Sequence, residues 1–165
     1  MNSHQEHPNL QRFVEKYREP IQKAEWIVVP AFLLAIALQS FNVFELPFVS
    51  YGLGILSAII YTFHSYGPSM LAIDNEEAKN LNLGLTNFVS KLAFMALSIG
   101  CVGVIFDSIA MKGGDILLIV SLLTLTICII IVLYLKIKDH ISSCPKLFMI
   151  RLLLGIVVIA LSIIS

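Results

Sequence analysis

Charged residues are scarce in this chain. They make up 13% of its 165 residues, whereas 58% of the residues are hydrophobic. A soluble domain usually carries roughly 25% charged residues. The chain therefore has too little polar material to cover a water-facing surface, which excludes an ordinary soluble globular domain and favours a membrane protein.

The sequence also lacks the motifs of known chemistry. Its three cysteines form no C-x-x-C pair and no cluster with its four histidines, so neither a disulfide framework nor a metal site is predicted. Neither G-x-S-x-G nor H-E-x-x-H occurs. The 11 basic and 11 acidic residues balance, which gives no reason to expect a nucleic-acid partner. We predict no enzymatic activity and no cofactor.

What the chain does contain is a series of long apolar runs. They cover residues 26–44, 46–66, 88–111, 116–135 and 147–164. A helix of about 20 apolar residues crosses the hydrocarbon core of a bilayer. The sequence therefore predicts an all-α, polytopic membrane protein. Residues 26–165 are expected to form a bundle of about five transmembrane helices, preceded by a short amphipathic interfacial helix within residues 1–25.

Positive charge predicts how the bundle is oriented. If the five spans alternate, ten of the 11 basic residues fall on one side and only Lys112 falls on the other. The ten are Arg12, Lys16, Arg18, Lys23, Lys79, Lys91, Lys136, Lys138, Lys146 and Arg151. Cytoplasmic loops are enriched in lysine and arginine. We therefore predict an integral protein of a bacterial inner membrane, with a cytoplasmic N-terminus and an external C-terminus.

The segment before the first run has the pattern of an amphipathic helix. Its apolar stripe consists of Leu10, Phe13, Val14, Tyr17 and Ile21. At 100° per residue these side chains fall within about 100° of arc, opposite the charged residues. Such a helix is expected to lie along the cytoplasmic headgroups and to end at Pro20. The alternative is a docking face for a cytoplasmic partner or a neighbouring subunit.

Polar side chains also form faces on the first two spans. The candidate polar interior consists of Gln39, Asn42, Ser57, Tyr61 and His64. One interpretation is a packing seam, because small and polar residues mark helix contacts in lipid. The other is a pore, with His64 as a proton-sensitive gate. No acidic or basic residue lies near the middle of a predicted span, which disfavours an ion-coupled pump.

The third run carries one charge near each end, Lys91 and Asp107. They are 16 residues apart, about 24 Å along a helix, so they cannot pair within it. Lys91 is expected to reach the cytoplasmic surface. Asp107 continues a helix-packing seam made of Ala93, Ala96, Gly100 and Gly103. We therefore expect replacement of Asp107 by leucine to disturb assembly more than the same change at Lys91.

These features predict a small oligomeric membrane subunit that anchors, senses or scaffolds together with a partner protein. The alternative is a passive channel or carrier whose pore is lined by the polar faces of the first two helices. In either case the expected partners are the lipid bilayer, further copies of this chain, and a cytoplasmic or membrane protein. A closed symmetric oligomer would serve both functions.

Overall fold

The computed structural model describes residues 8–40, 47–67, 79–137 and 146–164; residues 1–7, 41–46, 68–78, 138–145 and 165 lie outside this description. The helices are α1 (Pro8–Ser40), α2 (Pro47–Ser65), α3 (Lys79–Ser108), α4 (Gly114–Ile137) and α5 (Lys146–Ile164). The described residues lie in these helices or in short turns, and none of them lies in a strand. The prediction of an all-α bundle is confirmed.

Four of the helices are long and apolar enough to cross a membrane. Their apolar spans are Lys16–Leu38, Phe48–Ser65, Gly84–Ser108 and Gly114–Ile137. In α5 the described apolar stretch is shorter, Phe148–Ala160. α3 begins at Lys79 rather than at the predicted Phe88. The apolar run gives only the part of a helix that lipid covers, and the backbone hydrogen bonds continue beyond it.

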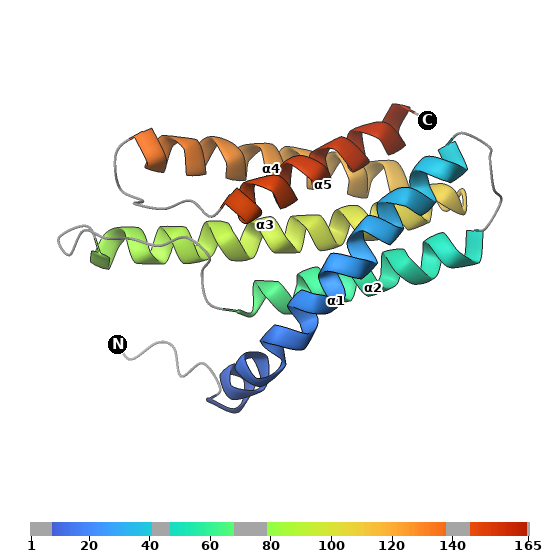
Figure 1. Ribbon diagram of the computed structural model, residues 1–165. Coiled ribbons are helices and arrows are strands. Elements are labelled where there is room, and N and C mark those ends of the chain that lie inside the picture. Colours follow the sequence, from blue (N-terminus) through green and yellow to red (C-terminus); the bar gives the residue numbers. More distant parts are fainter. Residues whose placement is uncertain (1–7, 41–46, 68–78, 138–145, 165) are drawn as a thin grey trace.

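α1 differs from its predicted form. We expected the helix of the N-terminal arm to end at Pro20, but α1 continues without interruption through Pro20 and Pro30. A proline inside a helix removes one backbone hydrogen bond and clashes with the preceding turn, and a long helix can accommodate this by bending. Figure 1 shows the first turns of α1 set at an angle to the rest of the helix. The arm and the first span are thus one bent helix.

α3 is the central helix of the bundle. It packs against α2, α4 and α5, whereas α1 packs mainly on α2 (Figure 1). Phe94 of α3, Leu118 and Leu125 of α4, and Phe148 and Leu152 of α5 are almost fully buried between the helices. The core therefore follows α3 along the bundle, and α1 lies at its edge.

α3 carries the predicted helix-packing seam. Ala93, Ala96, Gly100 and Gly103 are all buried, and Asp107 is half-buried. A Cβ atom added at Gly100 would lie 2.6 Å from Cδ1 of Ile159 and 2.7 Å from Oγ of Ser121. Gly100 thus lets both α4 and α5 approach the α3 backbone closely.

The end of α3 explains why the helix stops before the predicted Met111. Ala110 has a φ of 51°, in the left-handed region. The amide of Met111 donates to the carbonyl of Phe106 (2.8 Å), and the amide of Ala110 donates to that of Asp107 (2.9 Å). This is the hydrogen-bond pattern of a Schellman motif. It ends α3 at Ser108 and turns the chain directly into α4.

Candidate functional site: a buried charge cluster

Three ionisable side chains from three helices meet inside the bundle. Oε2 of Glu25 accepts hydrogen bonds from Nη2 of Arg151 at 2.6 Å and from Nε2 of His64 at 2.9 Å. Glu25 is 5% exposed, His64 8% and Arg151 7%. We refer to Glu25, His64 and Arg151 as the charge cluster. It joins α1, α2 and α5.

The topology of the bundle brings these residues to one level. Glu25 lies near the middle of α1, His64 lies one residue before the end of α2, and Arg151 is the sixth residue of α5. Consecutive spans alternate in direction. The end of α2 therefore lies beside the beginning of α5 and the middle of α1, whose first turns extend beyond the bundle (Figure 1). The cluster sits close to that end of the bundle rather than halfway along it.

The contact between Glu25 and Arg151 offsets the free-energy cost of burying their two charges. A buried carboxylate or guanidinium without a partner is expensive, and a well-placed pair offsets much of that penalty. Because a carboxylate can only accept hydrogen bonds, Nε2 of His64 has to carry the proton in this contact. The cluster has no net charge when His64 is neutral and a charge of +1 when His64 is protonated. Glu25 and Arg151 thus balance each other's charge inside the bundle.

Aromatic rings form one wall of the cluster. The ring centroid of Phe94 in α3 lies 5.3 Å from that of His64, 6.4 Å from that of Tyr61 and 5.7 Å from that of Phe148. Tyr61 lies one turn before His64 on α2 and is 5% exposed. These rings separate the cluster from the α3–α4 side of the bundle. Its hydrogen bonds are therefore made in an environment of low polarity, where they are strong.

On the other side of the cluster lies a groove between α1 and α5. One cavity of about 80 Å³ is lined by Glu25, Arg151, Tyr61 and apolar side chains that include Trp26 and Ile150. A second, of about 30 Å³, continues along α1 and α5 to Gly100 and Ile159. The two share Val29, Leu33, Tyr61 and Leu154. We call these two adjoining cavities the α1–α5 groove; its lining is mostly apolar, and its charged residues are Glu25 and Arg151 of the charge cluster.

The predicted polar interior is only partly within the described residues. Ser57, Tyr61 and His64 are buried, on the side of α2 that faces the other helices. The side chain of Gln39, and Asn42 altogether, lie outside the described part of the chain. The rings of Tyr61 and His64 both lie against the ring of Phe94, and His64 also contacts Glu25. Whether these residues line a pore stays a prediction.

Sequence reasoning missed Glu25 and Arg151 as members of a site. We placed Glu25 in the arm, just before the first apolar run, and Arg151 just inside the last one, where it counted only as one of the basic residues that predict the orientation. A signal was nevertheless available. Each of Glu25, His64 and Arg151 lies close to one end of a predicted apolar run, and the three ends are on the same predicted side of the membrane. Ionisable residues at one depth in neighbouring spans are candidates for pairing.

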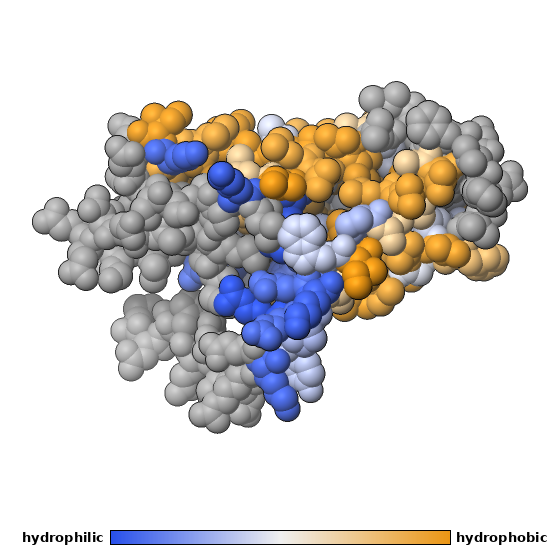
Figure 2. All heavy atoms as spheres, viewed as in Figure 1, coloured by the Kyte–Doolittle hydropathy of each residue, from blue (hydrophilic) through white to orange (hydrophobic). Residues whose placement is uncertain are grey.

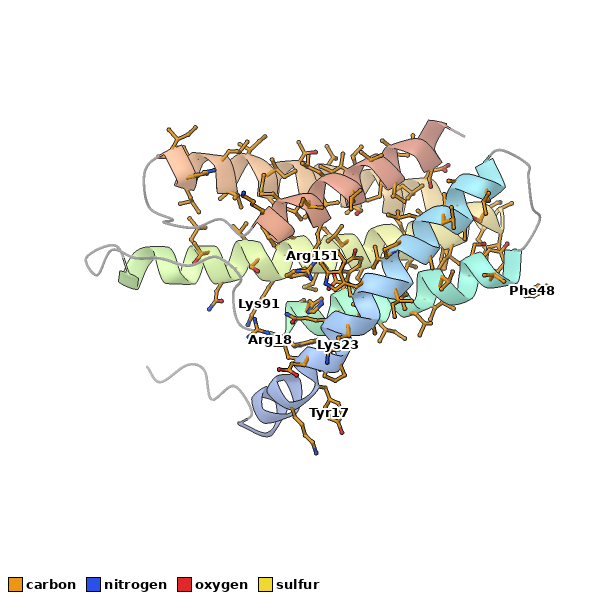
Figure 3. The ribbon with its side chains drawn as sticks, viewed as in Figure 1. Tyr17, Arg18, Lys23, Phe48, Lys91 and Arg151 are labelled. Atoms are coloured by element: carbon orange, nitrogen blue, oxygen red, sulfur yellow. The ribbon has the colours of Figure 1, made fainter. Side chains whose placement is uncertain are left out.

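Side chains of the predicted arm are described only in part. Tyr17 is exposed and Ile21 half-buried, whereas the side chains of Leu10, Phe13 and Val14 lie outside the described residues. Lys16, Arg18 and Lys23 are exposed. Figure 2 shows hydrophilic residues gathered over the N-terminal half of α1, and Figure 3 shows Arg18, Lys23, Lys91 and Arg151 far from Phe48. Basic side chains are thus concentrated toward one end of the bundle.

Two buried serines of the packing faces differ in their hydrogen bonding, which gives a first prediction. Oγ of Ser57 is buried without a partner, whereas Oγ of Ser121 donates to the carbonyl of Ala96 at 2.6 Å. A buried hydroxyl without a partner costs free energy, and a satisfied one contributes about 1 kcal/mol. We expect Ser57→Ala to leave the free energy of unfolding unchanged or raised, and Ser121→Ala to lower it by about 1 kcal/mol.

Denaturation of both serine variants in mixed detergent micelles would measure this difference. Each variant serves as the control for the other, because both remove one buried oxygen from a helix interior. A larger loss for Ser57→Ala than for Ser121→Ala would contradict the prediction and would point to a polar role of Ser57, as in the predicted pore.

Among the described residues, no group of three or more histidine, cysteine, aspartate or glutamate side chains could hold a metal ion. The charge cluster supplies only one carboxylate and one imidazole, and its arginine is a donor that cannot ligate a cation. No protein-family model, curated protein or solved structure matches the chain.

Proposed function

We propose that this chain is a small integral membrane subunit that works by association with another protein or with further copies of itself. The observation that carries the proposal is the exposure of α1. Only 11% of its most apolar window is buried, compared with 28% in α4 and 56% in α3. A helix that lies at the edge of its own bundle is well placed to pack against a helix of another chain.

The charge cluster supports this role, because it holds α1 in one position. Glu25 ties α1 to His64 of α2 and Arg151 of α5. The other side of α1 then presents Ile27 and Leu34, which are 73% and 61% exposed. A partner helix that packed on this face would meet a preoriented surface. Preorganisation lowers the entropic cost of association.

The same proposal includes the placement of the chain in its membrane. We infer a bacterial inner membrane, with the N-terminus in the cytoplasm and the C-terminus outside. The one-sided distribution of lysine and arginine supports this orientation. The exposed arm residues Lys16, Arg18 and Lys23 then face the cytoplasmic headgroups, where they are available to a cytoplasmic partner or to anionic lipid.

The test is to purify the tagged chain from its native membranes in lipid nanodiscs and to measure the mass of the particle. We expect an assembly larger than one chain. Replacing Ile27 and Leu34 together by alanine should shift it toward the single chain. The matched control replaces Leu123 and Ile130 on α4, which are 59% and 60% exposed, and should leave the assembly unchanged.

A single chain recovered without any partner would contradict the proposal, as would equal loss of assembly in both double variants. The alternative function, a passive channel or carrier, has its own signature. Solute flux into liposomes that contain the purified chain, lost on Ser57→Leu or His64→Leu, would favour the pore over the subunit.

A further inference from the structure

The α1–α5 groove combines an apolar floor with a polar end. Its cavities run from Glu25 to Leu33 on α1 and from Arg151 to Ile159 on α5. Eight residues of helix correspond to about 12 Å. Most of the lining is aliphatic, and the polar atoms come from Glu25, Tyr61 and Arg151 at one end. The groove therefore has the polarity profile of an amphiphile.

The groove is narrow and opens toward the membrane. Its two parts measure about 80 Å³ and 30 Å³, far below the roughly 300–1,000 Å³ of pockets that enclose drug-sized ligands. Trp26, Ile150 and Leu154 line the groove and are also 63%, 52% and 43% exposed, so they form its rim on the outer surface of the bundle. A thin, flexible chain fits this space, and a compact ligand does not.

Two lysines flank the polar end. Lys23 lies three residues before Trp26 on α1, and Lys146 lies four residues before Ile150 on α5. Residues three or four apart share a helix face, so each lysine continues one rim of the groove by one turn. Both are exposed, and α1 and α5 run in the same direction (Figure 1). The two ammonium groups therefore belong to the same end of the groove.

We infer that the α1–α5 groove binds one acyl chain of an anionic phospholipid, whose phosphate is bound by Lys23 and Lys146. Charge complementarity decides the class of lipid. The internal charge of Arg151 is balanced by Glu25, so the flanking lysines supply the positive charge that faces the headgroup. Trp26 adds the amphipathic ring that is common at headgroup level. The acyl chain then covers Val29, Leu33 and Leu154.

The experiment is to exchange the purified chain into mixed vesicles of phosphatidylglycerol and phosphatidylcholine, to extract it in mild detergent, and to count the retained lipids by native mass spectrometry. We expect one phosphatidylglycerol per chain to be retained at least fivefold over phosphatidylcholine. Leu154→Trp, which fills the groove, should lower the retained lipid at least fivefold. Leu153→Trp places the same ring on a neighbouring, 53% exposed position outside the groove and should retain it.

The headgroup part is tested separately by Lys23→Gln combined with Lys146→Gln. These residues are exposed, so the variant keeps the fold, and it should lose the preference for phosphatidylglycerol. Lys136→Gln, at the exposed end of α4, is the matched control. Equal retention of the two lipids by the unaltered chain, or equal retention by the Leu154 and Leu153 variants, would overturn the inference. Neither result depends on whether the chain assembles with a partner.

Discussion

Replacing Glu25 by leucine is expected to lower the free energy of unfolding by about 3–5 kcal/mol, the usual cost of breaking a buried ion pair from one side. The variant leaves the guanidinium of Arg151 in the bundle without its 2.6 Å partner, and it also removes the acceptor of His64. Leucine itself suits the apolar surroundings. The loss therefore comes from the charge that remains rather than from the side chain that is introduced.

The chain carries its own reporter for this experiment. Trp26 is the single tryptophan and directly follows Glu25. Its fluorescence during denaturation in mixed micelles reports whether α1 leaves the bundle, while circular dichroism reports the total helix content. Glu19→Leu is the matched control, because Glu19 is an exposed glutamate on the same helix. We expect that control to stay close to the unaltered chain in both signals.

A second substitution separates charge from packing. Glu25→Leu combined with Arg151→Met removes both buried charges. It should recover most of the stability lost in Glu25→Leu, because replacing a whole buried pair by apolar side chains is often neutral or stabilising. If the double variant were as unstable as the sum of its single changes, the pairing of Glu25 with Arg151 would not be the source of the loss. If Glu25→Leu were as stable as Glu19→Leu, the cluster would have no structural role.

The helices of this protein could be predicted from the sequence, because lipid imposes a simple requirement. Any segment in the hydrocarbon core has to satisfy its backbone groups internally, so a long apolar run is a helix. The bounds of α2, α4 and α5 therefore differ from the predicted spans by at most two residues at each end. The predicted break at Pro20 was wrong because α1 continues through this proline, and a long helix can accommodate a proline by bending.

The charge cluster could not be predicted in the same way. Whether Glu25 is a solvated arm residue or a buried ligand of Arg151 depends on how far α1 enters the bundle and on which face it turns toward α5. Hydropathy does not contain that information, because a glutamate next to an apolar run has the same hydropathy whether it is solvated or buried. Only the coincidence of three ionisable residues at one level indicated a site, and it did so without selecting their partners.

The same cluster explains how a helix with little buried surface stays in position. Helix association in lipid has no hydrophobic drive, so packing and polar contacts have to supply the stability. α3 has both, through its small residues and through the hydrogen bond that Ser121 of α4 donates to the carbonyl of Ala96. In the described part of α1, the buried side chains are Phe32 and Glu25. Loss of the cluster should therefore release α1 first, which would abolish the proposed partner surface and the groove together.

Replacing Gly100 by valine is the second change with a large expected effect, about 2–4 kcal/mol of lost stability. The new Cβ would lie 2.6 Å from Cδ1 of Ile159 and 2.7 Å from Oγ of Ser121, and both of these side chains are buried. Either α5 is displaced or Ser121 rotates away and loses its bond to the carbonyl of Ala96. The free-energy costs of overpacking and of the broken buried hydrogen bond thus add at this position.

Gly52→Val is the matched control, because Gly52 lies on α2 with no atom within 4 Å of an added Cβ. It should be neutral or slightly stabilising, since glycine is a poor helix former. Thermal denaturation of both variants in the same detergent gives the comparison. Equal stability of the two would mean that α4 and α5 do not approach the α3 backbone at Gly100. A loss confined to Gly100→Val would show that α4 and α5 pack closely against the small-residue face of α3 at this position.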